Sequence, residues 1–462
     1  MTLIKSISGI RGTIGGSTGS NLTPLDIVQF TAAFGAMLKQ KTDKRDKLKV
    51  VVGRDARVSG EMVNHLVCGT LMSIGADVFD LGLSTTPTVE MAVTGMNADG
   101  GIILTASHNP AQWNALKLLN EKGEFISASE GEWLLEMVEK QSFDFVEVDQ
   151  LGSYQKQHGW IDKHIQMILD LPLVDTEAIR NAGFKIAVDA VNSTGGIALP
   201  QLLNALGVEI IHELYCSPNG HFPHNPEPLP EHLTELSALV KSTKADLGLV
   251  VDPDVDRLAI VDENGNMFGE EYTLVAVADY ILSNKSGNTV SNLSSTRALA
   301  DVTAKYGTAY YAAAVGEVNV VEKMKAVGAV IGGEGNGGII YPELHYGRDA
   351  LVGIALFLTH LAKSDKKCSE LRQTYPAYFM SKNKLNLTAE TNVDQILASI
   401  AADFANEKAT TIDGVKIDFA EGWVHLRKSN TEPIIRVYSE GKSPEAAQEL
   451  ADKLLDWMKK SV

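Results

Sequence analysis

The sequence predicts an α/β protein with three similar α/β domains in series, built on mixed and largely parallel sheets, and a smaller C-terminal α+β domain. Strand-like and helix-like patterns alternate along the 462 residues, which favours βα units. One design, a strand followed by small or polar residues and a helical pattern, recurs at residues 48–55, 184–190 and 289–295. The tail differs, because two strands flank a polar turn and an amphipathic helix closes the chain.

Capping and turn residues set the bounds of the first elements. Thr23 is the expected cap of a helix that runs to Leu38, because proline takes the first helical position and Asp26 follows three residues after the cap. The strand of residues 48–55 comes next. An apolar run at residues 101–104 then predicts a buried strand.

Later elements follow from the same signals. The proline-rich stretch of residues 217–228 must be a loop. Apolar runs at residues 247–251 and 258–261 predict two strands on either side of a short polar segment. The closing unit has strands at residues 423–426 and 434–437, and its helix starts near Ser443.

Charge and cysteine content restrict the partners. The formal net charge is −17, whereas binding to a phosphate backbone needs a basic surface, so we expect no nucleic acid partner. An anionic small substrate would need a few local cations. Three widely spaced cysteines favour a reducing cytoplasm over a disulfide framework. We expect no membrane association, because the chain shows neither a signal-peptide core nor a membrane-length apolar run.

Ser107 lies at a strand end, in the run Thr105-Ala106-Ser107-His108-Asn109-Pro110. Pro110 prevents the preceding strand from continuing. Because α/β sheets place ligand sites at such strand ends, a hydroxyl beside an imidazole, a carboxamide and free backbone N–H groups is a candidate nucleophile. The alternative is an ST-turn, in which Ser107 bonds its own backbone.

Asp252, Asp254 and Asp256 occupy alternate positions between two apolar strands. Three carboxylates cannot lie in a buried strand without a partner, because uncompensated charge is costly. A loop that wraps its oxygens around Mg²⁺ fits, with positions left for water or phosphate. An EF-hand does not fit, since Arg257 stands where its sharp turn needs glycine. Arg257 would lie beside the metal and pair with a phosphate oxygen, and a solvated acidic turn is the alternative.

Two polar loops later in the chain are candidate ligand sites. In the glycine-rich segment 332–338, backbone can approach a ligand closely while Glu334 and Asn336 bond hydroxyls; a plain glycine turn is the alternative. The second loop offers guanidinium groups, hydroxyls and turn N–H groups, which together suit a phosphate, and its alternative is a polar hairpin turn. Its candidate residues are Arg427, Ser429, Asn430, Thr431 and Arg436.

Two cations complete the set of candidates. Arg11 stands between glycines in Ser8-Gly9-Ile10-Arg11-Gly12-Thr13. Lys117 follows the serine loop closely enough to return to the same site, although a solvated lysine is the default interpretation.

Together these loops resemble the α-D-phosphohexomutase superfamily, in the right order and over essentially the whole chain. The motifs TASHNP, DPDVDR and RKSNTEP are specific to it, and SGIRG and GRDARVSG match its N-terminal region. Residues 315–320 and 333–338 are most similar to phosphoglucosamine mutase-like members of the archaeal kind. Asn336 stands where common phosphomannomutase and phosphoglucomutase members have serine, and Ala115 replaces a usual glycine, so the sugar preference cannot simply be copied.

The resemblance implies four domains around a central cleft, with one loop from each. They are a phosphoserine-loop domain at 1–152, a metal-binding domain at 153–264, a sugar-recognition domain at 265–372 and a phosphate-binding domain at 373–462. Ser107 would carry a phosphoryl group, and Mg²⁺ would be held by Asp252, Asp254, Asp256 and a phosphoserine oxygen. Glu334 and Asn336 would choose the sugar. The non-reacting phosphate would be gripped by Arg427, Ser429, Asn430, Thr431 and Arg436.

The implied activity moves a phosphoryl group between C6 and C1 of a hexose phosphate, through a hexose 1,6-bisphosphate that also serves as activator. Mg²⁺ and Arg257 would neutralise charge, and the phosphate loop would position the substrate. Lys117, near two cations, is expected to have a depressed pKa and to act as general base, with Arg11 and His108 as helpers.

The expected substrate is glucosamine 6-phosphate, with glucose or mannose 6-phosphate as the second choice. A metal-dependent sugar phosphatase and a non-catalytic sugar-phosphate binding protein are more distant alternatives. The oligomeric state, monomer or homodimer, is left open.

Overall fold

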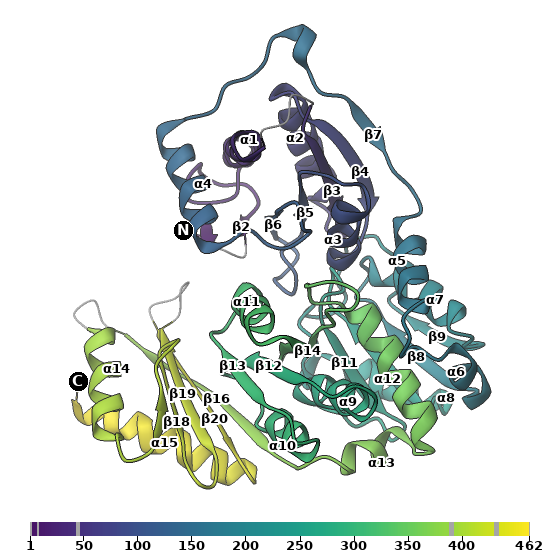
Figure 1. Cartoon of the computed structure of the whole chain (residues 1–462), viewed down its shortest axis with the longest axis vertical. Coiled ribbons are helices and arrows are strands. Elements are labelled where there is room, and N and C mark those ends of the chain that lie inside the picture. The colour runs from purple at the N-terminus through teal and green to yellow at the C-terminus, as the bar shows by residue number, and fades with distance from the viewer. Residues whose placement is uncertain (1, 7–8, 43–46, 388–391, 429–433, 462) are drawn as a thin grey trace.

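The protein is described by a computed structural model that covers residues 2–6, 9–42, 47–387, 392–428 and 434–461. Its elements form four units that follow one another along the chain, each around its own sheet (Figure 1). The first unit lies at the top of Figure 1, the second and third lie below it, and the fourth, in yellow, lies at the lower left. This arrangement confirms the predicted class of three α/β domains with mixed sheets and a distinct C-terminal domain.

The first sheet has seven strands in the order β1-β2-β6-β5-β3-β4-β7, with a parallel part from β5 to β7 and an antiparallel part from β1 to β6. The helix predicted from Thr23 is present, and the Asp26 carboxylate accepts a hydrogen bond from Thr23 N at 3.1 Å. It ends at Lys41 rather than Leu38. The strands are β1 (Ile4–Ser6), β2 (Gly9–Thr13), β3 (Lys49–Arg54), β4 (Asp77–Leu83), β5 (Gly100–Leu104), β6 (Trp113–Leu119) and β7 (Tyr154–Lys156). The helices are α1 (Pro24–Lys41), α2 (Gly60–Ser73), α3 (Thr86–Gly95), α4 (Ala128–Lys140) and the 3-10 turn η1 (Val148–Gln150).

The second and third sheets share one plan, in which three parallel strands are followed by one antiparallel edge strand. Their orders are β11-β10-β8-β9 and β13-β12-β14-β15. The second unit contains α5 (Trp160–Leu169), α6 (Thr176–Ala182), β8 (Lys185–Asp189), α7 (Gly195–Ala205), β9 (Ile210–Leu214), η2 (Pro230–His232), α8 (Thr234–Thr243), β10 (Leu247–Val251) and β11 (Leu258–Asp262). The third contains α9 (Glu270–Asn284), β12 (Asn288–Asn292), α10 (Ala298–Lys305), β13 (Tyr310–Ala313), α11 (Glu317–Val327), β14 (Ala329–Glu334), β15 (Gly338–Ile340), α12 (Ala350–Ser364) and α13 (Cys368–Gln373).

The second and third units are built on one continuous hydrophobic core, whereas the first and fourth have cores of their own. Helix α12 joins the two units, because it packs against α9 on one side and α5 and α6 on the other. The domain boundaries predicted from the sequence stay a prediction. Strand β7 lies beyond residue 152 but belongs to the first sheet.

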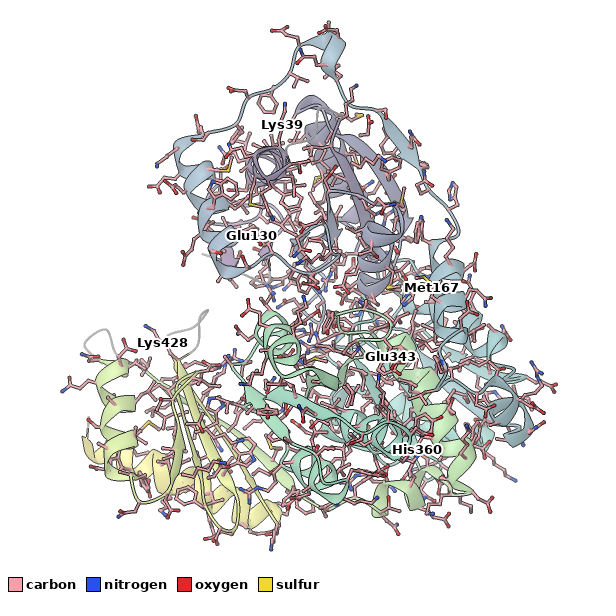
Figure 2. All side chains as sticks on the ribbon, viewed as in Figure 1. Lys39, Glu130, Met167, Glu343, His360 and Lys428 are labelled. Carbon is pink, nitrogen blue, oxygen red and sulfur yellow. The ribbon has the colours of Figure 1, made fainter. Side chains whose placement is uncertain are left out.

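The fourth sheet is antiparallel, in the order β16-β20-β19-β18-β17. Its elements are β16 (Phe379–Asn386), α14 (Val393–Asp403), β17 (Lys408–Thr410), β18 (Val415–Asp418), β19 (Trp423–Lys428), β20 (Ile434–Gly441) and α15 (Pro444–Ser461). Lys428, at the end of β19, lies at the upper end of this sheet in Figure 2. Within the described ranges, no helix is both long and apolar enough to cross a bilayer.

The candidate loops of the first three units occupy one topological position. The serine loop joins β5 to β6, the carboxylate loop joins β10 to β11, and the glycine-rich loop joins β14 to β15. In each case a parallel strand turns directly into an antiparallel neighbour. The three loops therefore emerge from equivalent sheet positions. The sequence repeat is weak because the strands that support the loops are similar, whereas the loop residues differ.

Candidate active site

A cavity of ≈ 410 Å³ lies where the four units meet. The predicted site residues that line it are Arg11, Ser107, His108, Lys117, Arg257, Glu334, Asn336, Arg427 and Arg436. The three aspartates are fully buried and contact lining residues. Ser429, Asn430 and Thr431 fall outside the described residues. The structure thus brings the remaining candidates together from all four units.

Ser107 is held in an unusual backbone conformation beside the carboxylate loop. Its φ of +49° lies in the left-handed region, which non-glycine residues adopt uncommonly. The hydroxyl donates a hydrogen bond to Asp252 Oδ2 at 2.7 Å, and its Oγ lies 3.3 Å from His108 Nδ1. Ser107 N donates to Thr105 Oγ1 at 2.9 Å. The backbone is therefore fixed by the loop itself, and the hydroxyl is aimed at the second unit.

The Arg57 side chain holds the serine loop through hydrogen bonds to its backbone. Its buried guanidinium donates to the carbonyl oxygens of Ser107, Asn109 (2.6 Å) and Pro110 (2.7 Å). The Nε atom donates to Asp55 Oδ2 at 3.0 Å, which compensates the charge. One fork of donors thus satisfies several carbonyls of a tight turn, which a lysine could not do.

We expect Arg57→Met to destabilise the first unit strongly. The substitution leaves the fully buried Asp55 carboxylate without its cation, and breaking such a pair costs about 3–5 kcal/mol. The melting temperature and urea denaturation measure the loss. Arg54→Met is the matched control, because the half-buried Arg54 side chain makes one hydrogen bond to the described residues, at 3.3 Å to Asp55 O. Equal melting temperatures for the two variants would contradict this role of Arg57.

The carboxylate loop fits a hard cation. One oxygen from each of Asp252, Asp254 and Asp256 lies within 4.8 Å of the others. The Oδ1 atoms of Asp254 and Asp256 are buried and accept no hydrogen bond from the described residues, an arrangement that is costly unless a ligand occupies it. Burial and the charges of Asp256 and Asp254 raise the pKa of Asp252 well above its usual value. These buried carboxylate oxygens without hydrogen bonds are ligands of the kind that suits Mg²⁺.

Lys117 corrects one expectation, because its pKa is raised rather than depressed. Burial alone would lower the pKa, but Asp254 and Asp256 outweigh it. Lys117 Nζ lies 2.6 Å from Asp254 Oδ2 and 3.2 Å from Asp256 Oδ2. The sequence suggested nearby cations as the dominant influence, whereas the structure places carboxylates against the ammonium. These two carboxylates favour the ammonium form of Lys117, and its role as general base stays a prediction.

Arg11 and His108 lie beside the serine loop as expected. Arg11 stands on β2, and its Nη1 donates to Asn109 Oδ1 at 3.5 Å. Burial and the charges of Arg257 and Arg11 lower the pKa of His108 well below its usual value, so its ring is neutral. Arg257 Nε lies 3.8 Å from Asp256 Oδ1, which places that guanidinium next to the carboxylate loop.

Arg348 connects the carboxylate loop to the glycine-rich loop. Its guanidinium lies 2.7 Å from Asp256 Oδ2, 2.9 Å from Glu317 Oε2 and 3.0 Å from Glu334 Oε2. Gly338 is needed for this approach, because a Cβ atom there would lie 2.4 Å from Arg348 Cδ. The guanidinium therefore couples two loops from different units.

The sequence reasoning missed the roles of Arg57 and Arg348. Arg57 entered it only within a motif that supported the resemblance. Arg348 precedes the apolar helix α12, and a charged residue next to an apolar run signals a buried ion with partners. The sequence did not reveal those partners, because each lies more than ten positions away along the chain or in another unit.

Glu334 and Asn336 both line the cavity, as predicted. Glu334 Oε1 accepts from Asn292 Nδ2 at 2.8 Å and from Gly316 N at 3.1 Å. Burial raises the pKa of Glu334, but Arg348 and these donors outweigh it, so the pKa lies below its usual value. The ionised carboxylate is therefore favoured and is held by partners on both oxygens.

Arg427 and Arg436 stand opposite each other on β19 and β20 and line the cavity from the fourth unit. Arg427 Nη1 lies 3.4 Å from Asp413 Oδ2, and this carboxylate also accepts a hydrogen bond from Val315 N at 3.0 Å. Asp413 thus connects the fourth unit to the third beside the paired arginines.

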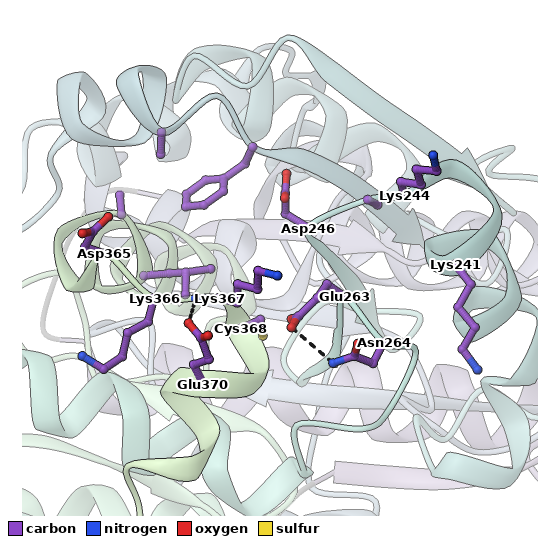
Figure 3. A pocket seen from close by; sticks show the side chains of 15 residues that line it. Lys241, Lys244, Asp246, Glu263, Asn264, Asp365, Lys366, Lys367, Cys368 and Glu370 are labelled. Atoms are coloured by element: carbon purple, nitrogen blue, oxygen red, sulfur yellow. Dashed lines mark hydrogen bonds between the residues drawn. The ribbon is translucent and has the colours of Figure 1, made fainter.

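A larger hollow of ≈ 840 Å³ lies away from the cavity, between α8, the turn that follows β11 and the α12–α13 connection (Figure 3). Its charges are balanced. They come from Lys241, Lys244, Lys366, Lys367, Asp246, Glu263, Asp365 and Glu370. None of the predicted site residues lines it, so the smaller cavity is the candidate active site.

Comparison with known protein families accounts for all four units. Residues 3–145, 162–265 and 269–378 match the alpha/beta/alpha domains I, II and III of phosphoglucomutase/phosphomannomutase, and residues 384–456 match its C-terminal domain. These matches, together with the fold and site, define an enzyme that transfers a phosphoryl group within its substrate, an isomerase.

Relatives and solved structures agree with this class. A Thermococcus kodakarensis protein named phosphoglucomutase/phosphomannomutase is 37% identical over 454 residues, 96% of this chain and 98% of that protein. A Sulfurisphaera tokodaii protein named phosphoglucosamine/phosphogalactosamine mutase is 32% identical over 96% of this chain and 97% of its own. A structure of a phosphoglucomutase/phosphomannomutase family protein from Burkholderia thailandensis covers 99% of this chain and 98% of its own, with 27% identity and a TM-score of 0.85. The chain belongs to the phosphoglucomutase/phosphomannomutase family, the α-D-phosphohexomutases.

Proposed function

We propose that the protein interconverts glucosamine 6-phosphate and glucosamine 1-phosphate, with Ser107 as a reusable phosphate carrier. The observation that carries the proposal is the Ser107 hydroxyl, which points at Asp252 inside a cavity whose far side presents Arg427 and Arg436. A cytoplasmic location, which the cysteine content favours, is part of the proposal.

The transfer would proceed in two balanced steps. In the first step the bond between phosphorus and Ser107 Oγ breaks as the oxygen of the free sugar hydroxyl bonds to that phosphorus. The proton that the sugar hydroxyl loses ends on Ser107 Oγ, and the sugar becomes a hexose 1,6-bisphosphate. After the intermediate turns over, its other phosphoryl group returns to Ser107. His108 is neutral and close enough to exchange a proton with Ser107 Oγ. One pair of arginines can hold either phosphate, so a single site is sufficient.

The acidic loop would hold Mg²⁺ through Asp252, Asp254, Asp256 and a phosphoserine oxygen. When bound, the ion supplies charge neutralisation for the phosphoryl oxygens and for the carboxylates that keep Lys117 protonated. Arg257 and Lys117 add fixed positive charge around the same centre. Added hexose 1,6-bisphosphate would act as activator by phosphorylating Ser107.

A carboxylate beside the sugar loop favours an amino sugar. Glu271 lines the cavity and packs against Gly335, where a Cβ atom would lie 2.0 Å from Glu271 Oε2. Burial and the charge of Glu270 raise its pKa well above the usual value. A sugar ammonium bound next to Glu271 would favour the ionised carboxylate and pair with it, whereas a neutral hydroxyl of glucose or mannose would not.

We expect kcat/KM to be highest for glucosamine 6-phosphate, followed by glucose and mannose 6-phosphates. Glu271→Gln should lower kcat/KM for glucosamine 6-phosphate by about 10-fold and leave the value for glucose 6-phosphate within about 2-fold. The glucose substrate serves as the internal control for folding. Equal losses for both sugars would contradict this basis for specificity. Release of inorganic phosphate in place of isomerisation would support a phosphatase.

A further inference from the structure

A second cluster of metal-binding side chains is buried where the first three units meet. It consists of His164 on α5 together with His345 and Asp349, which precede helix α12. His164 and Asp349 are fully buried. Thr88 and Glu90 approach the cluster from α3 in the first unit. None of these residues belongs to the active-site cavity.

The geometry of the inner atoms suits one metal ion. Asp349 Oδ2 lies 3.0 Å from His164 Nε2 and 3.3 Å from His345 Nε2, and one ligand atom from each residue lies within 4.8 Å of the others. The other oxygen, Asp349 Oδ1, accepts a hydrogen bond from Leu351 N at 2.8 Å and thereby caps α12. Asp349 is therefore anchored by one oxygen and presents the other to the two imidazoles.

The outer nitrogens of both imidazoles contact oxygens, as in known metal centres. Thr88 Oγ1 lies 3.0 Å from His164 Nδ1, and Glu90 Oε2 lies 3.3 Å from His345 Nδ1. Metal-ligating histidines usually donate their second N–H to such an oxygen, which fixes the tautomer that leaves the inner nitrogen free. At His164 this contact has the geometry of a hydrogen bond, whereas His345 Nδ1 lies against Glu90 Oε2 without that alignment.

The cluster also contains a second buried carboxylate, Glu90, whose Oε2 atom lies 3.3 Å from His345 Nδ1. Both carboxylate oxygens of Glu90 are buried without a hydrogen bond among the described residues. Gly347 makes room for this carboxylate, because a Cβ atom there would lie 1.9 Å from Glu90 Oε2. Two buried carboxylates, Glu90 and Asp349, thus face two imidazoles that are neutral when they ligate a metal. A divalent cation would balance the pair.

We propose that His164, His345 and Asp349 form a second, structural metal site that takes a zinc-like divalent ion. Two imidazole nitrogens and one carboxylate oxygen suit Zn²⁺, whereas the all-oxygen set of the carboxylate loop suits Mg²⁺. The ion would fasten α5 and the start of α12 to each other, next to Arg348. It would therefore stabilise the junction that positions Arg348 between the two active-site loops.

The test is zinc binding by the full-length protein in millimolar Mg²⁺, which occupies the oxygen-only site. We expect one tightly bound Zn²⁺ per chain, measured by competition with a chromophoric chelator and by elemental analysis. Asp254→Asn should retain this ion. His164→Gln and His345→Gln should weaken it by at least about 100-fold, since each removes a direct ligand. His360→Gln, in a half-buried histidine on α12 (Figure 2), is the matched control.

Cobalt substitution and thermal melting keep the proposal testable if the histidine variants fail to fold. Co²⁺ in the wild type should give the intense visible absorption of a low-coordinate site with imidazole ligands. Chelator treatment should lower the melting temperature by about 3 °C or more, and Zn²⁺ but not Mg²⁺ should restore it. The proposal is overturned if wild-type protein in Mg²⁺ holds no Zn²⁺, or if both histidine variants hold it as tightly.

Discussion

Replacing Ser107 by alanine should reduce mutase turnover by at least about 10⁴-fold while leaving the fold intact. Without the hydroxyl no phosphoenzyme can form, and loss of a covalent nucleophile removes the reaction path rather than slowing one step. The loop should survive, because the Ser107 backbone is held by Thr105 and Arg57 through its N–H and carbonyl. Among the described residues, the side chain itself forms hydrogen bonds with Asp252 and His108 only.

Two measurements check this result. Turnover is assayed in the presence of hexose 1,6-bisphosphate, and intact mass is measured before and after incubation with the same compound. Wild-type protein should gain the mass of one phosphoryl group and the variant should not. Ser129→Ala, at an exposed position on α4, is the control. A Ser107→Ala protein with near wild-type turnover would remove the serine from the mechanism.

The sequence revealed those parts of the site whose functional side chains lie within one short segment. Ser107 and the three aspartates each follow an apolar strand, so their loops could be placed without knowledge of tertiary contacts. Lys117 could be placed near Ser107 for the same reason, but its pKa could not. That property depends on carboxylates 137 and 139 positions away, which no local pattern reveals.

The fold class was predicted correctly, but the contacts between the units were not predicted. Alternating strands and helices were sufficient to indicate three α/β units. No local pattern indicated that the second and third units share one core, because that core depends on α12, which packs against helices of both. Arg348 and Asp349 precede this helix, so their partners also lie across the junction. Contacts between units are set by packing geometry, and periodicity within one element carries no information about them.

Asp254→Asn should have the second large effect, lowering kcat by about 10³-fold and weakening Mg²⁺ activation by about 100-fold. The substitution removes one of three anionic oxygens from the loop and also deprives buried Lys117 of its closer counter-charge. Asparagine is nearly isosteric and can still accept the hydrogen bond that Thr86 Oγ1 donates at 2.6 Å. The loss of kcat should therefore reflect the missing charge and weaker metal binding rather than collapse of the loop.

Titration of activity with Mg²⁺ separates the two contributions. If the carboxylate is a ligand, saturating Mg²⁺ should recover part of the lost kcat, and the concentration for half-activation should rise. Asp262→Asn is the matched control at the other end of β11. Asp262 Oδ1 accepts hydrogen bonds from Asn264 N and Asn266 N, both at 2.9 Å, and an asparagine carbonyl can do the same. An unchanged Mg²⁺ requirement in Asp254→Asn would show that the cation binds elsewhere, and the acidic loop would then act only as the counter-charge of Lys117 and Arg348.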